Sequence, residues 1–599
     1  MQGMAPRTVY SVLEEAAQRY SSLPALHQPE SGGRYRTYTW DEYRNAVREI
    51  ACGLRALGFR RGDIIALDAE TRAEFYLADL GIMANGCIAA ALYTSLPPAD
   101  RARNLANCDA RAVIADNART RELLLQAGAD PHLPWILLEG AGEGALSLDE
   151  LRERGRRAMG QDPALFSRIC DEVQPEDPAI LYLTSGATGE PKMGLTTHQA
   201  LIANISMGPQ VLPLRPDDVT LAFLPSAHIA QRVVIELLPL LSGAQVYFSE
   251  GLTKMPAEIR RVRPTFLLAP PRVWERVYAS ISAEIRKRPR LARAIYYSAL
   301  GLALRAGRMR QQGQQPPAWM QRALQVADRL VFAKIRERLG GRIRVAASGA
   351  APLSPDLARF YQAIGLPLIE GYGLTEGGVA TLNPLDDPRP GSIGKALPNV
   401  EVRLTEEGEL LIKSPALFSG YYKDPEATAA VLRDGWLYTG DLAEMDDEGY
   451  IYITGRKKEV IISSNGKKIY PAKVETLFKT EPLISQVVLL GDRQPFVTAL
   501  FTINPAVAET LDGMEAYRGK PVSELASAPP VLEQIAKAVK AANRQLAGFE
   551  QIRRFRILDR EFSLERGELT PTMKVRRTQV MENFRDLITE LYAGREEFA

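Results

Sequence analysis

The sequence contains few cysteines and no cysteine pair. Only four occur among its 599 residues, and no two of them form a CxxC motif: Cys52, Cys87, Cys108 and Cys170. Disulfide frameworks and redox motifs depend on paired cysteines. We therefore expect reduced, buried thiols in a cytosolic protein.

An excess of one charge and an uninterrupted apolar run are also absent. The 74 Lys and Arg residues nearly balance the 72 Asp and Glu residues, which leaves a net charge of +2. This balance argues against a nucleic-acid partner, because nucleic-acid binding normally leaves a strong basic excess. The first ten residues, MQGMAPRTVY, lack the pattern of a signal peptide. We therefore expect a cytoplasmic protein.

Length and apolar patterning predict an α/β protein with more than one domain. A chain of 599 residues exceeds the size of one hydrophobic core. Thr39 and Glu42 match a capping box at the start of a helix that stops at Gly58. The apolar run DIIALD (63–68) has the length of a strand, and residues 77–93 predict a buried helix followed by a strand rather than a membrane span. Repeated βα units predict sheets covered by helices.

Two later regions differ in composition. Residues 281–340 predict an inserted helical hairpin around the loop QQGQQPP (311–317), and residues 284–311 hold eight Arg or Lys and one acid. This basic face is either solvated or a docking surface for anionic membrane lipid. A boundary is expected near Gly455, where β-hairpin patterns give way to a basic turn and a new α/β alternation. We therefore predict an N-terminal domain over 1–454 and a C-terminal domain over 455–599.

The segment LYLTSGATGEPKMG (181–194) has the composition of a phosphate-binding loop. Backbone amides at glycines, hydroxyl groups and a cation all bind anionic oxygens. The segment is not a Walker A loop, because no Ser or Thr follows its lysine, and it contains no GxGxxG fingerprint. A plain glycine-rich turn is the alternative. The candidate phosphate-binding residues are Thr184, Ser185, Gly186, Thr188, Gly189 and Lys192.

Further segments follow in a characteristic order. They are FLPSAHIAQR (223–232), PTFLLAPPRVWERV (264–277), ASGAAPLSPDL (347–357), EGYGLTEGG (370–378), GSIGKALPNVEV (391–402), WLYTGDLAEMDDEGYIYITGRKKEVIISSNGKKIYP (436–471) and GELTPTMKVRR (567–577). Together they resemble the AMP-forming acyl- and aryl-CoA synthetases, the adenylate-forming enzymes, over roughly residues 37–577. PPRVWERV, the basic hairpin and GKKIYP most resemble the long-chain fatty-acid–CoA ligases.

The resemblance implies a fold and a reaction. The expected fold is α/β, with a large N-terminal domain of several helix-covered sheets and a small hinged α+β lid, as in acyl-CoA synthetases and firefly luciferase. A fatty acid would attack the α-phosphate of ATP to give an acyl-adenylate and pyrophosphate. Coenzyme A would then displace AMP. ATP, Mg²⁺ and coenzyme A are the implied cofactors, because both steps pass through negatively charged states.

The same resemblance implies roles around the phosphates. The loop would close over the β- and γ-phosphates with Lys192, and Thr375 would bond the α-phosphate. Ala187 stands where the family often has Thr, and Met193 where Gly often follows the lysine. Glu376 would bind Mg²⁺ with Thr184 as a second contact, since hard cations prefer oxygen ligands. A solvated loop carboxylate is the alternative for Glu376.

Adenine and ribose contacts are implied in the same way. Tyr372 would lie on the adenine ring, and Gly371 and Gly373 suit a backbone that approaches a flat ligand. Asp441 would accept hydrogen bonds from the ribose hydroxyls, unless it only caps a turn, and Arg456 would reach the same ribose. The opposite adenine wall would be formed by Gly349, Ala350, Ala351 and Pro352.

The implied catalytic lysine belongs to the lid. Lys574 would bridge the carboxylate and the α-phosphate, and Pro571 keeps the preceding Thr570 extended; a surface lysine without a role is the alternative. His228 would position the carboxylate or gate the acyl site rather than act as a base, because the carboxylate is already ionised at neutral pH. A core histidine is its alternative. Lys458 takes the position of the family's hinge.

The remaining expectations concern the acyl chain and coenzyme A. Gly466 would line the pantetheine channel after the lid turns, with Lys468 near the CoA phosphates. An apolar tunnel is expected near His228, along the strand around Leu267 and Leu268, and beside Gly371.

Two alternatives remain open. The enzyme could load an acyl carrier protein in place of coenzyme A, as a fatty-acyl-AMP ligase does. A non-catalytic nucleotide-binding regulator is disfavoured, because Lys574 and Glu376 are both present.

Overall fold

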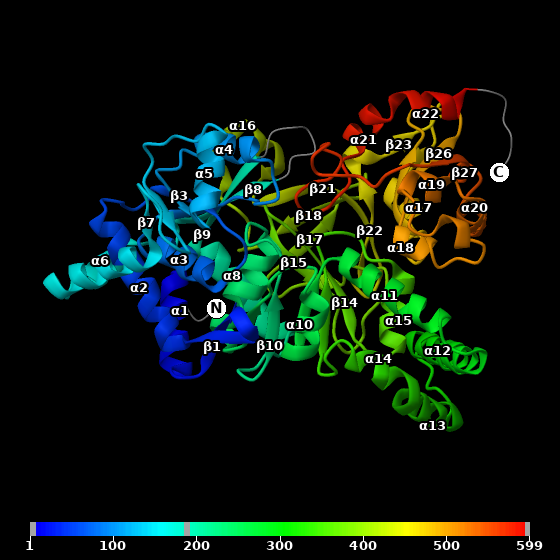
Figure 1. The fold of residues 1–599 in the computed structure, drawn as a ribbon, viewed down its shortest axis with the longest axis horizontal. Helices are drawn as coiled ribbons and strands as arrows, with labels where there is room; N and C mark the ends of the chain where they lie inside the picture. The colour runs from blue at the N-terminus through cyan, green and yellow to red at the C-terminus, as the bar shows by residue number, and fades with distance from the viewer. Residues whose placement is uncertain (1–6, 185–191, 594–599) are drawn as a thin grey trace.

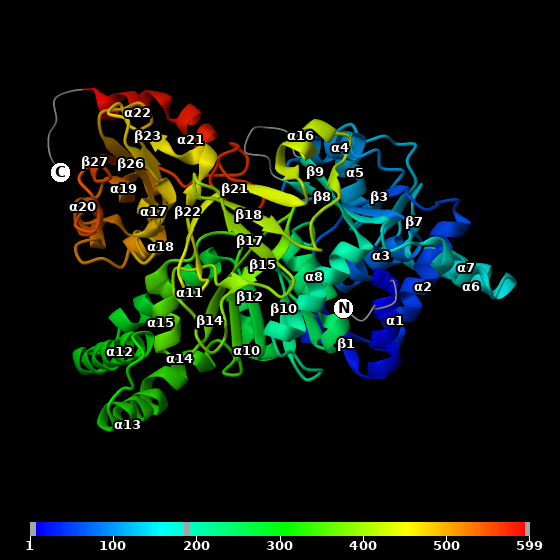
Figure 2. The ribbon, with the colours of Figure 1, turned by 180° about the vertical axis from the view of Figure 1, so that it is seen from behind.

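The computed structural model describes residues 7–184 and 192–593. They form a large N-terminal body and a smaller C-terminal domain, and the latter (orange to red) lies at one end of the molecule in both ribbon views (Figures 1 and 2). Phosphate-loop residues 185–191 lie outside the described residues, so Ser185, Gly186, Thr188 and Gly189 are not placed.

Two large, mostly parallel sheets form the body. The eight-stranded sheet has the order β19 (Gly420–Tyr421), β9 (Lys192–Thr197), β8 (Pro178–Thr184), β4 (Ile88–Ala91), β3 (Ile64–Asp68), β5 (Ala112–Ala115), β6 (Trp135–Leu137), β7 (Leu146–Ser147). The nine-stranded sheet has the order β16 (Lys395–Ala396), β15 (Gly378–Leu382), β14 (Leu368–Leu374), β13 (Val345–Ser348), β12 (Phe266–Ala269), β10 (Val219–Ala222), β11 (Gln245–Phe248), β1 (Pro24–Glu30), β2 (Arg34–Thr39).

Helices lie between and outside these sheets. The central core joins the facing sides of both sheets to helices that include α1 (Val9–Tyr20), α2 (Trp40–Ala56), α3 (Ala73–Ala84) and α8 (His198–Val211). The outer face of the eight-stranded sheet packs on α4 (Pro98–Asn107) and α5 (Ala118–Gln126), while α6 (Leu148–Gln161) and α7 (Leu165–Glu172) pack on α2. The outer face of the nine-stranded sheet packs on α10 (Met255–Val262), α11 (Pro271–Arg286) and α15 (Pro355–Ala363).

Several local expectations are confirmed. Thr39 and Glu42 form the expected capping box of α2, and DIIALD contains β3. All 12 residues of α3 are buried, so the apolar window 77–93 is apolar because α3 is enclosed on every side. Among the described residues no helix is both long and apolar enough to cross a bilayer. The four cysteines are free, and Cys170 is only half-buried.

The helical insertion has the expected central loop but starts earlier. The loop 312–317 separates α12 (Arg290–Gln311) from α13 (Ala318–Ala327), and a π-helical turn (Asp328–Phe332) leads into α14 (Ala333–Glu337). Ile335 is buried, and Leu324, Ala327 and Val331 pack against the same core. The first helical stretch is two helices, α11 and α12, because Pro289 interrupts the chain between them.

A third sheet connects the body to the C-terminal domain. It contains β17 (Glu401–Leu404), β18 (Glu409–Lys413), β21 (Trp436–Met445), β20 (Leu432–Arg433) and β22 (Ile451–Arg456). β22 ends at Arg456, and the cores of the C-terminal domain begin at Ile461. The boundary after residue 454 stays a prediction.

The C-terminal domain has a three-stranded sheet with a core on each face. Its strands are β25 (Ile484–Leu490), β26 (Val497–Ile503) and β27 (Ile552–Ile557), and a small hairpin of β23 (Ile461–Ile462) and β24 (Lys468–Ile469) precedes them. One core includes residues of α17 (Pro471–Thr476), α18 (Pro505–Ala508), α19 (Val522–Ser527) and α20 (Pro529–Asn543), and the other includes residues of α21 (Arg577–Asn583) and α22 (Arg585–Tyr592). The Arg272 guanidinium of α11 donates to the Ser485 carbonyl, which ties the two domains together.

Candidate active site

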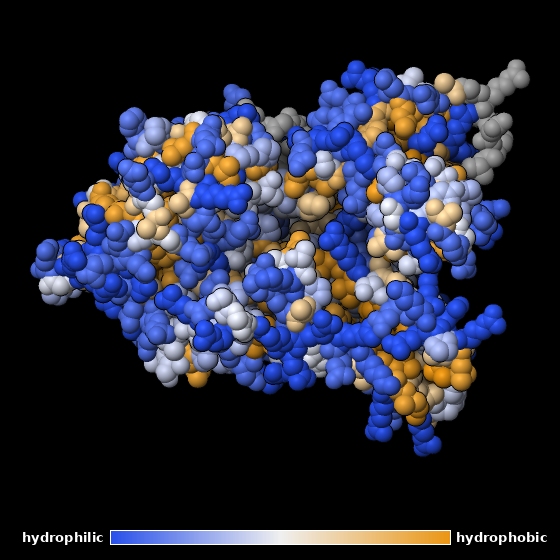
Figure 3. All heavy atoms as spheres, viewed as in Figure 1, coloured by the Kyte–Doolittle hydropathy of each residue, from blue (hydrophilic) through white to orange (hydrophobic). Residues whose placement is uncertain are grey.

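A cavity of about 1930 Å³ lies where the C-terminal domain meets the body. It opens at the carboxyl ends of the parallel strands β12 and β13, where ligands of α/β sheets commonly bind. The space-filling view shows the molecule hollowed at this junction (Figure 3). The expected site residues that line it are Thr184, Lys192, His228, Gly349, Ala350, Ala351, Pro352, Gly371, Tyr372, Gly373, Thr375, Glu376, Asp441, Arg456, Lys458 and Lys574.

The two expected coenzyme A contacts do not line the cavity. Gly466 lies in the turn between β23 and β24, and Lys468 lies on β24. Both are exposed to solvent. The structure therefore does not bring this turn to the site in the present arrangement of the two domains.

Asp441 links two other expected residues. It is buried on β21, opposite Arg456 on β22, and the Arg456 Nε donates to its Oδ1 at 2.8 Å. The Tyr372 hydroxyl donates to its Oδ2 at 2.5 Å. Burial, and then the Asp441 charge, hold the pKa of Tyr372 well above its usual range, so the phenol stays neutral. Each carboxylate oxygen of Asp441 retains a further lone pair that a ligand hydroxyl could use.

The expected adenine wall brings two backbone segments close together. A Cβ added at Gly349 would lie 3.4 Å from the carbonyl oxygen of Gly371. The next residue, Ala350, has a left-handed φ of +69°, a conformation that strains a non-glycine residue. Such strain is typical of ligand-binding segments. The two backbone segments therefore lie close together where they line the cavity.

Glu370 adjoins this wall, and the sequence reasoning assigned it no role. It lines the cavity yet is buried, and its Oε1 accepts a hydrogen bond from the Leu353 N–H at 3.0 Å. Burial raises the pKa of Glu370 to about 8. The sequence signal that could have identified Glu370 as a site residue was its place in the EGYG segment, directly before Gly371.

The phosphate side of the cavity centres on Tyr421, which was also missed. The Tyr421 hydroxyl donates to the Glu376 Oε1 at 2.6 Å, and the Lys192 Nζ lies 4.7 Å from the centre of its ring. Thr184 stands opposite Lys192 across β8 and β9 and donates from Oγ1 to the Lys192 carbonyl at 3.0 Å. Tyr421 comes from β19, beside β9, so only the pairing of these strands revealed its position.

The donor set fits a magnesium ion that arrives with a polyphosphate. No group of three or more His, Cys, Asp or Glu residues gathers to hold a metal in the described part of the chain. Glu376 offers one carboxylate, and Thr184 could add a hydroxyl. Magnesium is often bound by one or two carboxylates together with substrate phosphates and water. A dedicated protein cage is therefore not required.

His228 and Lys574 face the same part of the cavity from different domains. The His228 Nδ1 accepts the Ala230 N–H at 3.2 Å, so the neutral ring carries its proton on Nε2. Burial, and then the Lys574 charge, lower the pKa of His228 to about 4. Burial also lowers the pKa of Lys574, although the side chain stays accessible to solvent in the cleft, which limits the effect.

Lys574 is presented by a short, bonded loop. The Thr570 N–H donates to the Lys574 carbonyl at 2.8 Å, and the Lys574 N–H donates to the Thr570 Oγ1 at 3.0 Å. Met573 between them has a left-handed φ of +63°. These bonds hold the backbone of Lys574, so that its side chain extends into the cavity.

The remaining wall of the cavity is apolar, as expected of an acyl site. Leu268 lines it, but the expectation for Leu267 was wrong: that side chain packs in the core on the outer face of the sheet. Successive side chains of a strand point to opposite faces, so only one of the two could line the cavity. Other apolar lining residues are Ile205, Val211, Leu212, Val233, Val234, Leu238, Phe266, Leu382 and Leu397.

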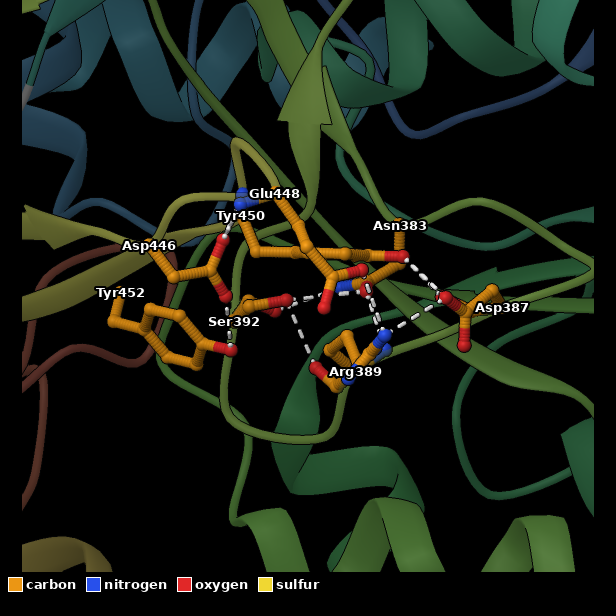
Figure 4. A network of polar contacts seen from close by, with 8 residues as sticks. All are labelled: Asn383, Asp387, Arg389, Ser392, Asp446, Glu448, Tyr450 and Tyr452. Atoms are coloured by element: carbon orange, nitrogen blue, oxygen red, sulfur yellow. Dashed lines mark hydrogen bonds and ion pairs between the residues drawn. The ribbon is translucent and has the colours of Figure 1, made fainter. Parts of the chain in front are cut away.

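A polar network braces the loop at one edge of this wall. Gly391 and Ile393 line the cavity, and the neighbouring Arg389 binds Asp387 at 3.1 Å and Glu448 at 2.9 Å (Figure 4). Asn383 also binds the segment, because its Nδ2 donates to the Ser392 carbonyl at 2.7 Å. The network joins the loop after β15 to the turn between β21 and β22, which steadies the cavity edge.

Comparison with known proteins extends the resemblance. Residues 13–422 match the family described as AMP-binding enzyme, and residues 458–596 match the AMP-binding enzyme C-terminal domain. Over 579 residues the chain is 36% identical to the long-chain-fatty-acid–CoA ligase FadD15 of Mycobacterium bovis, covering 95% of this chain and 94% of that protein. Over 605 residues it is 31% identical to the peroxisomal long chain acyl-CoA synthetase 7 of Arabidopsis thaliana, covering 94% and 83%.

Two solved structures share the fold. The adenylation domain of a carboxylate reductase from Mycobacterium chelonae superposes with a TM-score of 0.75 at 23% identity, covering 99% of this chain and 92% of that one. The anthranilate CoA ligase AuaEII, in complex with anthranoyl-AMP, has a TM-score of 0.73 at 19% identity and covers 97% and 98%. At these identities the likeness concerns the fold alone.

Proposed function

The chain belongs to the AMP-binding enzyme family, and from this premise we propose that it is an ATP-dependent long-chain fatty-acid–CoA ligase. One observation carries the proposal. Lys574 of the C-terminal domain lines the same cavity as His228, which stands at the start of the apolar wall, and as Asp441 and Tyr372 on the polar side. A cation from a second domain thus faces the place where a fatty carboxylate would meet a nucleotide.

The first half-reaction needs charge stabilisation rather than proton removal. A carboxylate oxygen of the fatty acid attacks the α-phosphorus of ATP, the bond to the oxygen shared with the β-phosphorus breaks, and pyrophosphate leaves. Lys574 holds the carboxylate against the α-phosphate, and neutral His228 donates its Nε2–H to the carboxylate. Lys192 and Thr375 offset the charge that develops on the phosphates. Magnesium, held by Glu376 and Thr184, would polarise the phosphate oxygens when bound.

Nucleotide recognition rests on the other side of the cavity. We assign the ribose hydroxyls to Asp441, with Arg456 holding that carboxylate, and the adenine to the slot between Tyr372 and the Gly349–Pro352 segment. Gly371 and Gly373 let β14 lie closely against β15, where an added Cβ would meet Leu382 or the Gly378 carbonyl.

The second half-reaction requires a different arrangement of the domains. The CoA thiolate attacks the carbonyl carbon of the acyl-adenylate, the bond from that carbon to the phosphate oxygen breaks, and AMP leaves. Gly466 and Lys468 lie outside the cavity. We propose that the C-terminal domain turns about Lys458, withdraws Lys574 and brings the β23–β24 turn to the site.

Lys574→Ala tests whether Lys574 acts in the first half-reaction and not in the second. The variant should lose acyl-adenylate formation, measured by exchange of labelled pyrophosphate into ATP, and keep thioester formation from supplied acyl-AMP and coenzyme A. Lys537→Ala, at an exposed lysine that pairs with Glu533 on α20, is the matched control. Equal loss of both activities in Lys574→Ala would refute the assignment.

A separate experiment tests the acceptor by offering coenzyme A or an acyl carrier protein to the same preparation. Transfer of the acyl group to the carrier protein alone would refute the proposal that coenzyme A is the acceptor.

We also propose that the protein docks peripherally on anionic lipid through the α12–α13 hairpin, on the cytoplasmic face of a membrane. Residues 285–327 carry nine Arg or Lys and no Asp or Glu, in a chain whose net charge is +2. Large apolar side chains are exposed on the same hairpin, at Leu291 (74%), Ile295, Tyr297, Trp319 (61%) and Val326, and Leu330 (59%) is exposed on the π-helical turn that follows it. Trp319, Val326 and Leu330 follow helical spacing, so they share one face.

The hairpin is placed to reach a surface. It projects from the body at the lower right of Figure 1, and Figure 3 shows orange side chains on this projection among blue ones. Cations that flank an exposed apolar stripe are the pattern of helices that lie in a membrane interface.

Vesicle binding tests this surface. The parent should sediment with vesicles that contain phosphatidylserine and not with pure phosphatidylcholine, and the binding should weaken with salt. Trp319→Ser/Leu330→Ser should bind at least about tenfold more weakly, whereas Met445→Ser, at a residue that is 47% exposed on β21, should bind like the parent. Equal binding of both variants, or binding to nucleic acid instead of lipid, would refute the proposal.

A further inference from the structure

A buried polar cluster lies directly behind the apolar wall of the cavity, which we call the acyl wall. The π-helix Gln231–Leu237 begins three residues after His228, and its Val233 and Val234 line the cavity. Arg232 and Glu236, one turn apart, are buried and are absent from the cavity lining. The π-helix therefore carries apolar side chains on the cavity side and charged side chains on the protein side.

Arg232 is held by a residue from a distant part of the chain. It forms an ion pair with Asp79 of α3, and both side chains are 0% exposed. Its guanidinium also lies 5.6 Å from the centre of the Tyr182 ring on β8. A second contact joins the same elements, because the Gln231 Nε2 donates to the Tyr76 hydroxyl of α3 at 2.8 Å. The acyl wall is thus fastened to α3 by polar contacts.

The charges of the cluster are balanced. Burial, and then the Asp79 charge, keep the pKa of Glu236 well above its usual range, so this carboxyl is protonated. The one remaining anion, Asp79, faces the one cation, Arg232. A π-helical turn is less regular than an α-helix and is common at functional sites.

Stability alone does not explain the cluster. The Arg232 Nε and Nη1 have no hydrogen-bond partner among the described residues. Incompletely satisfied buried groups reduce stability, and apolar side chains of similar volume often serve at least as well. In some proteins, however, a buried polar or ionic contact fixes one register between two elements.

We propose that the Asp79–Arg232 pair holds the π-helix in the register that presents Val233, Val234 and Leu238 to the acyl chain, and thereby sets the range of chain lengths that the enzyme accepts. The inference rests on the proposed fatty-acid ligase function. Asp79 and Arg232 are positioning residues, because they act only through the apolar wall.

The test compares two buried ion pairs of the same kind. Asp79→Leu/Arg232→Met removes both charges behind the acyl wall. Asp68→Leu/Arg101→Met removes the buried pair between β3 and α4, whose atoms lie 2.9 Å apart and which does not line the cavity. For each protein, kcat/KM is measured by pyrophosphate exchange with saturated acids of eight to eighteen carbons, together with KM for ATP.

Each methylene admitted to or excluded from an apolar site changes kcat/KM about fourfold. We therefore expect the first variant to change the ratio between sixteen- and eight-carbon acids about tenfold or more, with KM for ATP unchanged. The control pair should leave the ratio unchanged, and so should Glu236→Gln, since that side chain is already neutral. If folded Asp79→Leu/Arg232→Met keeps the parent's ratio of kcat/KM values within about twofold, the inference is overturned. An equal change of this ratio in Asp68→Leu/Arg101→Met would also overturn it.

Two further outcomes can be distinguished from failure of the inference: a variant that does not fold and a parent that is inactive. If the double variant does not fold, Arg232→Lys serves instead, because it keeps the charge and loses the planar geometry. An unchanged ratio in folded Arg232→Lys would also overturn the inference. A parent that exchanges pyrophosphate with none of the acids would contradict the proposed function itself, whereas an active parent with an unchanged variant contradicts only the positioning role.

Discussion

Replacing Glu370 with Gln should stabilise the protein in alkaline solution and leave it unchanged in acid. Glu370 is 7% exposed at the start of the adenine wall, and its Oε1 accepts the Leu353 N–H at 3.0 Å. A Gln side chain of the same shape keeps this acceptor. It differs from Glu only in that it never ionises.

The magnitude follows from the raised pKa of Glu370. Burial moves this pKa from 4.5 to about 8 in the folded protein, whereas the unfolded chain ionises near the ordinary value. Since the folded state favours the protonated carboxyl, its stabilising contribution is complete below pH 4.5, is lost as the pH rises, and changes little above pH 8. Between about pH 5 and pH 8 the parent should lose about 3 to 4 kcal/mol relative to Glu370→Gln.

The assay is denaturant unfolding of both proteins at several pH values, with the free energy of unfolding extrapolated to water. Below pH 4.5 the two proteins should agree, which provides an internal control. Their difference should widen towards pH 8 and then level off. A difference that does not depend on pH, or a parent that is the more stable protein at pH 8, would refute the reasoning that Glu370 is buried and protonated.

Three further predictions use other parts of the site. Asp441→Asn should raise KM for ATP by about tenfold to a hundredfold, because the ribose hydroxyls would no longer donate to a charged carboxylate, a bond of about 1.5 to 3 kcal/mol; an unchanged KM would contradict the ribose assignment. Leu268→Ala should change the preferred acid length in the pyrophosphate exchange assay, whereas Leu267→Ala should cost about 2 to 5 kcal/mol of stability without changing that preference, and the reverse pattern would mean that the wall is misplaced. Ala350→Gly should raise Tm by relieving the left-handed backbone, at about 1 kcal/mol; a lower Tm would mean that the backbone there is unstrained.

The sequence predicted those parts of the fold that depend on near neighbours. The capping box of Thr39 and Glu42, strand β3 and the loop 312–317 are each encoded within a few residues, and all are confirmed. The resemblance also indicated which motifs belong together, and most of the named residues do line one cavity. Their individual roles stay predictions.

Other features could not be read from local patterns. Leu267 and Leu268 are equally apolar, and only the position of the strand between two helix layers decides which one faces the cavity. Tyr421 meets Glu376 because β19 pairs with β9, and no spacing in the sequence reports that pairing. Pro289, by contrast, was a local signal for a helix break that the sequence reasoning overlooked.

By itself, then, the sequence determined the family, the short elements and the order of the motifs, because helix caps, apolar periodicity and turn residues act over a few positions. Tertiary structure alone decided that Asp79 pairs with Arg232, that Glu370 is enclosed, and that Lys574 and His228 line one cavity from different domains. Such contacts join segments far apart in the chain. They arise only when the sheets, the enclosed helices and the second domain have packed together and excluded water from the groups between them.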